Sequence, residues 1–297
     1  MQRAAAAHPG AMEYDFRRGR AEAHGRVEQR NHAKSAGTAG CRGRPGDLPA
    51  VLTALYADIH ANQEALAACL ARADALGAGR HVFLGDHVGY GPDPAEVLDT
   101  IAARVERGGI AVAGNHDRAA IEVPAGRMTD SARLAIEWTQ RQLEKRHRDF
   151  LDGMPLTVQE AGRLYVHANA WAPEKWEYIT SAYDAARSMR ATPCRWTFCG
   201  HVHTPGLYHM TEDGRTTAFA PAPGVRIPLS RRRRWLAIPG SVGQPRDGNP
   251  AACVALLEEN TLHLTFLRVP YDTEAAARRI RASGLPAELG ARLVSGT

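Results

Sequence analysis

The sequence of 297 residues lacks three features that would each indicate a particular class of protein. No apolar run approaches the roughly 18 residues that mark a transmembrane helix. The alanine-rich start has no cationic region leading into an apolar core, as a secretory signal would have. The cysteines number five, an odd count, and no two of them form a CxxC pair. We therefore expect no membrane partner, no disulfide framework and no cysteine zinc site, and we predict a cytoplasmic protein.

A large excess of charge is also missing once the first 47 residues are set aside. The formal net charge of the chain is +5. Residues 1–47 hold nine Lys and Arg against five Asp and Glu, a net of +4, which leaves +1 for the other 250 residues. The larger part therefore shows no basic excess, and we predict no specific nucleic-acid partner. The alternative, RNA binding by these arginines, would make residues 1–47 essential for function.

Residues 1–47 have no sustained apolar pattern either, and Val27 is their only β-branched aliphatic residue. Such a segment cannot bury enough surface to offset the entropy that it would lose on ordering. We predict that residues 1–47 form a disordered basic N-terminal extension. No linker or internal repeat interrupts residues 48–297, which we predict to form one domain.

The rest of the chain alternates between apolar runs and helical patterns. We expect buried strands over residues 51–60, 81–86 and 109–114, with helices between them that begin near Asn62 and cover 94–107. Strands alternating with helices predict an α/β fold, in which ligands gather at the carboxyl ends of the strands. For the second half we expect helices within 128–160 and further strands over 162–169, 195–203, 231–240 and 251–259, the last two antiparallel.

Five of these apolar strands end on side chains that can bind a metal ion. They are Asp58 and His60, Asp86, Asn115, His167, and finally His201 with His203. Because residues i and i+2 of a strand point to the same face, the side chains of Asp58 and His60 can converge on one point. The side chains of His201 and His203 can do the same. Carboxylate, amide and imidazole groups together suit Mn, Fe, Zn, Co or Ni. Seven such ligands are too many for one ion and about right for two that share a carboxylate.

Each of these signals is weak when it stands alone. A lone strand-end histidine such as His167 is more often satisfied by local hydrogen bonds than bound to metal. Gly114 to Asp117 could form an ordinary turn, because Gly, Asn and Asp all favour turns. The occurrence of all five together indicates a dinuclear hydrolytic site.

The ordered motifs DIH, GDHVGYGP, GNHD, VHAN and GHVH resemble those of the calcineurin-like metallophosphoesterase superfamily. The loop PGSVGQPRDGNPAA over residues 239–252 resembles its bacterial YfcE-like branch of phosphodiesterase or diadenosine-tetraphosphatase-like enzymes. The similarity runs from about residue 50 to the C-terminus. It implies a layered β-sandwich flanked by helices, with a dinuclear metal site at the carboxyl ends of the strands.

The resemblance also assigns the ligands to two ions. One metal would be bound by Asp58, His60, Asp86 and His203. The other would be bound by Asp86, Asn115, His167 and His201, so that Asp86 bridges them. The expected cofactors are two divalent ions, with manganese preferred over Fe, Zn, Co or Ni.

The expected activity is metal-dependent hydrolysis of phosphodiester or nucleotide phosphoanhydride bonds by a hydroxide that the two metals activate. His116 would assist the leaving group, and Asp117 would be its orienting carboxylate. The expected partner is a small phosphorylated substrate, with nucleotides among the candidates. The sequence does not indicate an oligomeric state.

Tyr90 and Arg118 have two readings each, and Arg231–Arg234 and His87 have one. Tyr90 could line the substrate cleft or lie in a rigid loop that only positions Asp86. Arg118 could bind a second phosphate or form a surface salt bridge. The run Arg231–Arg234 is predicted to be a solvated hairpin edge. His87 is expected to point away from the metal ligands.

Three alternative functions remain at this level. A serine/threonine-type phosphoprotein phosphatase is disfavoured, because that group typically has Asp-Arg-Gly where this chain has Gly89-Tyr90-Gly91, and Glu where it has Asp117. A phosphomonoesterase would use the same residues. A non-catalytic scaffold on the same fold usually loses metal ligands, whereas this chain has every expected ligand residue.

Overall fold

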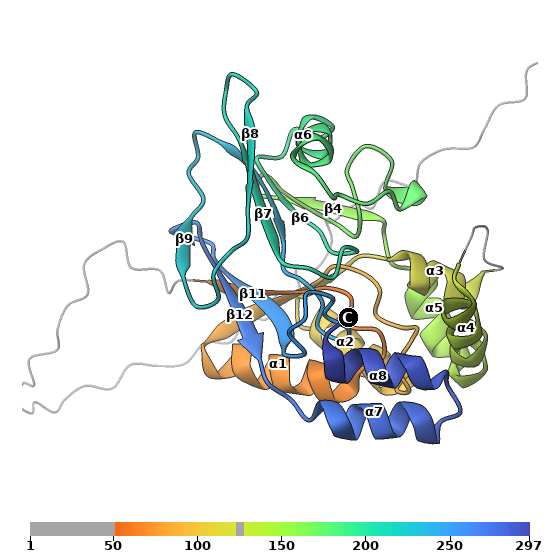
Figure 1. Cartoon of the computed structure of the whole chain (residues 1–297). Helices are drawn as coiled ribbons and strands as arrows, with labels where there is room; N and C mark the ends of the chain where they lie inside the picture. Colours follow the sequence, from red (N-terminus) through yellow and green to blue (C-terminus); the bar gives the residue numbers. More distant parts are fainter. Residues whose placement is uncertain (1–50, 123–127) are drawn as a thin grey trace, which may run out of the picture. The chain divides into compact units, whose positions relative to one another are not determined.

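The structure, a computed structural model, describes residues 51–122 and 128–297 and contains two mixed six-stranded sheets within them (Figure 1). The extension predicted for residues 1–47 lies outside the described residues. In spatial order the first sheet consists of β3 (Ile110–Ala111), β2 (Ala78–Phe83), β1 (Leu52–Tyr56), β11 (Ala252–Glu258), β12 (His263–Val269) and β9 (Arg226–Pro228). The second consists of β4 (Thr157–Glu160), β5 (Arg163–Val166), β6 (Trp196–Phe198), β10 (Arg234–Ile238), β7 (Gly206–Met210) and β8 (Thr216–Phe219).

Helices cover the outer faces of the two sheets (Figure 1). On the first sheet lie α1 (Gln63–Ala75) and α2 (Pro94–Val105), and on the second lies α6 (Ala182–Arg190). The remaining helices are α3 (Asn115–Ile121), α4 (Asp130–Gln142), α5 (Lys145–Asp152), α7 (Thr273–Ala282), α8 (Ala287–Ser295) and the 3₁₀ helix Pro173–Lys175. No helix in the described part of the chain combines the length and the apolarity needed to span a membrane.

The alternation of side chains along β1 explains the layers. Leu55 points into an apolar cluster between the two sheets, where it joins Phe198 and Trp235 from the second sheet. Its neighbour Tyr56 points the other way, into the cluster under α1 that includes Leu66. Because successive residues of a strand face opposite sides, one apolar strand fills two cores. The result is a helix–sheet–sheet–helix sandwich, and the predicted α/β class is confirmed.

Parallel strands in each sheet direct their carboxyl ends to a common region. In the first sheet β1, β2 and β3 are parallel, and in the second β5, β6 and β10 are parallel. The predicted antiparallel pairing of residues 231–240 with 251–259 is wrong. Strand β10 pairs with β6 and β7, whereas β11 pairs with β1 and β12 in the other sheet. The chain between them therefore crosses from one sheet to the other.

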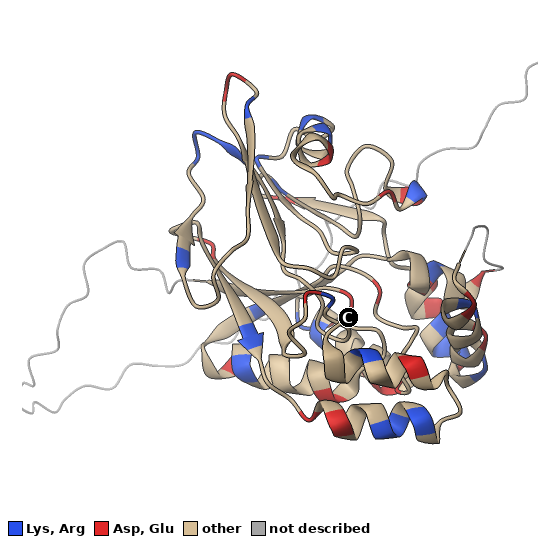
Figure 2. Ribbon diagram, viewed as in Figure 1, with Lys and Arg blue, Asp and Glu red and all other residues tan. Residues whose placement is uncertain are grey.

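The arginine run before β10 is only partly the solvated edge that was expected. Figure 2 shows it as a stretch of basic residues leading into the second sheet, and Arg231 to Arg233 are exposed. Arg234, however, begins a central strand. Its Nη1 donates to the carbonyl oxygens of Met189 and Thr192, each at 2.6 Å. Because carbonyls at a helix C-terminus lack partners within the helix, Arg234 stabilises the end of α6.

Asn62 joins three separated segments at the start of α1. Its Oδ1 accepts a hydrogen bond from Ala65 N at 3.0 Å, which confirms it as the N-cap. Its Nδ2 donates to the Gly243 carbonyl at 3.0 Å and to the Tyr271 hydroxyl at 3.1 Å. One buried amide thus fixes the helix, the chain between the sheets and the segment before α7.

We predict that Asn62→Ala lowers the free energy of unfolding by about 2–3 kcal/mol, because it removes a helix cap and leaves a buried carbonyl without its partner. Thr129→Ala, which removes the exposed N-cap bond of α4, is the matched control and should cost about 1 kcal/mol. Urea unfolding of both variants measures the difference. Equal losses would show that the two bonds of Asn62 to distant segments add no stability.

Candidate metal centre

Six of the seven predicted metal ligands lie in loops just beyond the strands rather than on them, and the seventh, Asn115, is the first residue of α3. Strand β1 ends at Tyr56 and β6 at Phe198, so the ligands that follow them are outside the pleated backbone. Five of the ligands have positive φ angles between 49° and 70°, namely Asp58, His60, Asp86, His201 and His203. Non-glycine residues with positive φ are uncommon and cluster at functional sites. The side chains therefore converge through sharp left-handed turns, and the strand alternation used to predict their convergence is the wrong reason.

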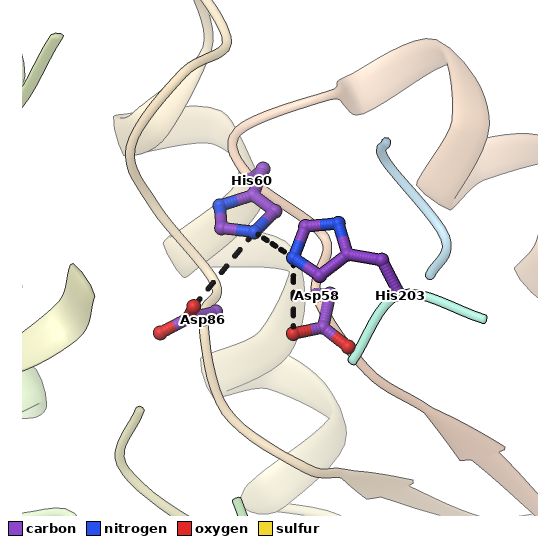
Figure 3. A group of neighbouring side chains, drawn as sticks. All are labelled: Asp58, His60, Asp86 and His203. Atoms are coloured by element: carbon purple, nitrogen blue, oxygen red, sulfur yellow. Dashed lines mark hydrogen bonds and ion pairs between the residues drawn. The ribbon is translucent and has the colours of Figure 1, made fainter. Parts of the chain in front are cut away.

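The first group of converging side chains is Asp58, His60, Asp86 and His203 (Figure 3). One candidate ligand atom from each lies within 4.8 Å of the others, and all four residues are buried. The Nε2 atoms of His60 and His203 are 3.1 Å apart. His60 Nε2 lies 3.7 Å from Asp86 Oδ2, and His203 Nε2 lies 3.6 Å from Asp58 Oδ1.

The second group contains Asp86 again, with His167 and His201. His167 Nε2 lies 3.4 Å from Asp86 Oδ2 and 3.1 Å from His201 Nδ1. Asn115 adds an amide oxygen 3.2 Å from His167 Nε2. The seven residues predicted from the sequence thus lie together in two groups, and Asp86 belongs to both.

The orientation of the four histidines tests whether these groups suit a cation. Each histidine uses its other ring nitrogen to bond a backbone carbonyl oxygen. These bonds are His60 Nδ1 to Val88 O (3.2 Å), His167 Nδ1 to Leu84 O (2.8 Å), His201 Nε2 to Trp176 O (2.9 Å) and His203 Nδ1 to Gln244 O (2.7 Å).

Because a carbonyl only accepts, the nitrogen that faces it carries the proton of the neutral imidazole. The nitrogens that face each other then hold only lone pairs. In the first group two such nitrogens, on His60 and His203, lie 3.1 Å apart, where they repel and cannot form a hydrogen bond; the same distance separates His167 Nε2 from His201 Nδ1 in the second group. A cation between them removes the repulsion, and metal-binding histidines usually donate their other ring N–H to such a carbonyl. The donor set therefore fits divalent metal ions in a dinuclear site.

Burial keeps three of the histidines ready to bind a cation. It lowers the pKa of His201 to about 3, with a further contribution from His167, and it also holds the pKa values of His60 and His203 well below the ordinary value. His167 differs, because burial lowers its pKa but the adjacent Asp86 carboxylate raises it to about 9. Without a cation, the extra proton of His167 lies on Nε2 between His201 and Asp86, so a positive charge is favoured at this point whether a proton or a metal ion supplies it.

His116 lies beside the two groups but belongs to neither. Its ring packs edge-on against His60, with ring centroids 4.9 Å apart, and lies 4.5 Å from the ring of Tyr90. Its backbone N–H donates to Asp86 Oδ1 at 2.9 Å, which fixes it relative to the shared carboxylate. Burial lowers the pKa of His116, and its Nδ1 has no hydrogen-bond partner among the described residues.

The sequence predicted that Asp117 contacts the His116 ring, but its hydrogen-bond partners are backbone amides. Its Oδ1 accepts from the backbone N–H groups of His87 (2.8 Å) and Val88 (3.3 Å), and its Oδ2 accepts from Gly114 N (2.8 Å). A carboxylate that binds three amides near a helix N-terminus is well stabilised there. Asp117 therefore holds the loop that carries Asp86 against the start of α3.

The two predicted substrate contacts, Tyr90 and Arg118, lie in different places. Tyr90 lies at the centre, with its ring 4.6 Å from that of His60. Arg118 does not, because its Nη2 donates to the Met154 carbonyl at 2.8 Å just beyond the end of α5. The negative end of a helix attracts a guanidinium, and Arg118 thus joins α3 to α5. As expected, His87 is not part of either group; it is fully buried.

Three residues at the centre were not singled out from the sequence. Tyr178 stacks on His201 with ring centroids 4.0 Å apart, and nothing in the surrounding sequence indicates it. Gln244 accepts the His203 bond through its carbonyl and binds Arg246 through its side chain. The quoted loop 239–252 contains both of the latter residues, so its resemblance to a family motif was the available signal.

Comparisons with known proteins agree with this geometry. Residues 52–261 match the model of the calcineurin-like phosphoesterase superfamily domain. The crystal structure of a metallophosphoesterase from Sphaerobacter thermophilus is 35% identical, with a TM-score of 0.73 over 84% of this chain and 100% of that chain. An uncharacterized protein of Methanocaldococcus jannaschii is 33% identical over 251 residues, which are 82% of this chain and 98% of the relative. A hypothetical protein of Pyrococcus horikoshii, 23% identical, shares the fold with a TM-score of 0.68 over 83% of this chain and 99% of its own.

We predict that the number of metal ions bound per chain depends on whether a ligand serves one group or both. After loading with manganese, wild-type protein should hold about two ions, His203→Ala about one, and Asp86→Asn fewer than one, because only Asp86 belongs to both groups. Elemental analysis of purified, desalted protein measures the ratio.

His209→Ala is the matched control, since His209 lies on β7 and in neither group. Circular dichroism of each variant checks that it is folded. Two ions retained by folded Asp86→Asn protein would contradict the shared ligand.

Proposed function

Because the chain belongs to the calcineurin-like phosphoesterase superfamily, we propose that it cleaves phosphodiester or nucleotide phosphoanhydride bonds of a small phosphorylated substrate. Family membership makes it a metal-binding hydrolase that acts on ester bonds. The bond type, the two-metal mechanism, manganese as the metal and a cytoplasmic location are the further parts of the proposal. The YfcE-like branch suggested by the loop 239–252 is consistent with it.

The observation behind the proposal is the two groups of buried ligands that share Asp86, with every histidine ring oriented by a backbone carbonyl. When bound there, two divalent ions would lower the pKa of a water molecule and neutralise charge on phosphoryl oxygens. A structural ion needs only one closed set of ligands. A carboxylate shared by two ligand groups therefore favours a hydrolytic site over a structural one.

The residues of the chain have separate tasks in this proposal. Asp58, Asn115 and the four histidines would hold the ions, and their carbonyl partners would keep each imidazole in one tautomer. Asp86 would set the separation of the two groups. Asp117 would act through the loop amides that it binds, so it is a positioning residue and not a catalytic one.

His116 is the candidate for the leaving group. It is neutral, buried and adjacent to both His60 and Tyr90, yet its ring has no ligand role in either group. A neutral imidazole can donate a hydrogen bond or a proton to the oxygen that departs from phosphorus. General acid–base assistance of this kind typically contributes about 10²–10⁴-fold to the rate.

We predict that manganese-loaded protein hydrolyses a bis-aryl phosphate and that His116→Ala lowers kcat by about 10²–10⁴-fold while the metal content stays at the wild-type value. Release of the aryl alcohol measures the rate, and elemental analysis measures the metal. His263→Ala, on β12, is the control and should leave both unchanged.

Two results would count against the proposal. Full activity of His116→Ala would remove the histidine from the leaving-group role. Fully loaded wild-type protein that fails to hydrolyse bis-aryl, mono-aryl, cyclic-nucleotide and dinucleoside polyphosphate substrates would favour the non-catalytic scaffold.

A further inference from the structure

The chain that crosses between the sheets, residues 239–248, is packed directly on the first metal group. Gly243 N donates to Asp58 O at 3.0 Å, and Ser241 Oγ donates to the same carbonyl at 2.7 Å. A Cβ atom at Gly243 would collide with the carbonyl oxygen of Ile59. The crossing segment therefore has a fixed position relative to the Asp58 turn, and so do the side chains that it carries.

Gln244 connects this segment to a metal ligand on one side and to Arg246 on the other. Its backbone carbonyl accepts the bond from His203 Nδ1 at 2.7 Å. Its side-chain Oε1 accepts from Arg246 Nη2 at 2.8 Å and from Arg246 Nε at 3.2 Å. Because one acceptor holds two nitrogens of the planar group, the direction of the guanidinium is fixed.

These two bonds leave one edge of the guanidinium available. Of its five N–H groups, Gln244 takes one on Nε and one on Nη2, so the two on Nη1 and the other on Nη2 are left for other acceptors. An edge made of two terminal nitrogens matches two oxygens of a phosphate in a bidentate arrangement.

Arg246 lies next to the residues proposed to act on the substrate. Its Cζ is 5.9 Å from the ring centroid of Tyr90, and that ring is 4.5 Å from His116 and 4.6 Å from His60.

No carboxylate in the described part of the chain pairs with Arg246. The following residue, Asp247, instead forms an ion pair with Arg268, and within residues 51–122 and 128–297 no carboxylate oxygen lies within 4.0 Å of the Arg246 guanidinium. A half-buried arginine beside a site built for cations raises the positive potential there, which favours an anionic ligand.

We propose that Arg246 binds the non-bridging phosphoryl oxygens of the substrate beside the metal centre. The ligand that it recognises is a tetrahedral phosphate with at least two free oxygens, which phosphodiesters, phosphomonoesters and inorganic phosphate all provide. This inference rests on the proposed function, because it places the substrate phosphate at the site of Asp58, Asp86 and His116.

The competing explanation is a purely structural role, in which Arg246 only holds Gln244 and hence His203. The two roles differ in what a substitution changes. Loss of a structural support would loosen His203 and lower the metal content. Loss of an anion contact would weaken phosphate binding and raise KM with the metal content unchanged.

The test compares Arg246→Gln, Arg246→Lys and the control Arg268→Gln in the manganese-loaded full-length protein. Arg268 belongs to the same loop network through Asp247 and the Ala251 carbonyl, and its replacement removes the same charge. Calorimetry measures the dissociation constant of inorganic phosphate, steady-state assays give kcat and KM for the bis-aryl phosphate, and elemental analysis gives metal per chain.

Arg246→Gln should weaken phosphate binding by on the order of 10- to 100-fold, because hydrogen bonds to a charged group are lost. Arg246→Lys should fall between wild type and Arg246→Gln, since it retains the charge without the two-nitrogen edge. Arg268→Gln should leave the phosphate constant unchanged. A wild-type phosphate constant in Arg246→Gln, or a loss of metal from it, would overturn the assignment.

The same experiment separates this inference from the proposed function. If phosphate binds wild type more tightly than Arg246→Gln but no phosphoester is hydrolysed, the anion site stands and hydrolysis of those substrates is rejected. If both proteins hydrolyse the substrate with equal KM and equal phosphate constants, hydrolysis stands and the role of Arg246 is rejected.

Discussion

The fixed orientation of four histidine rings is the constraint on which the rest of the centre depends. Two pairs of imidazole nitrogens face each other at 3.1 Å, and the opposite nitrogen of every ring is bonded to a carbonyl. The carbonyls come from four separate places, at Leu84, Val88, Trp176 and Gln244. The rings cannot turn away from each other without breaking a buried hydrogen bond, which costs about 1–3 kcal/mol. The fold therefore holds the site in a form that a cation completes.

The two-sheet architecture supplies these constraints from both sides. The loops of Asp58 and Asp86 follow strands of the first sheet, as does the start of α3 with Asn115, and the loops of His167 and His201 follow strands of the second. The chain between β10 and β11 crosses the gap, and its amides bond the Asp58 turn while its Gln244 carbonyl bonds His203. Neither sheet alone holds a complete ligand group, so the sandwich itself is a requirement of the site.

The sequence predicted much of the centre because strands in α/β folds end in ligand-bearing loops, and the pairs Asp58–His60 and His201–His203 stand at such ends. The prediction was wrong for two side chains whose hydrogen-bond partners depend on the tertiary structure. Asp117 was predicted to contact His116, but three loop amides reach it first. Arg118 was a candidate phosphate contact, but its guanidinium donates to the Met154 carbonyl just after α5. The amides of His87 and Val88 and the carbonyl of Met154 are 29 to 36 residues away in the chain, and only Gly114 is a near neighbour. Strands β4, β7, β8 and β9, with three to five residues each, are too short for a periodic pattern to identify.

The position of Asp86 has a consequence for how the ions bind. Its Oδ2 is 3.7 Å from a nitrogen of one group and 3.4 Å from a nitrogen of the other, so the first ion to bind alters the charge and orientation of a ligand that the second requires. The two binding equilibria are then thermodynamically linked, and the linkage is reciprocal: the factor by which either ion changes the affinity for its neighbour is the same in both directions. Occupancy of this centre is accordingly a cooperative property of the pair, described by a coupling free energy as well as by two affinities.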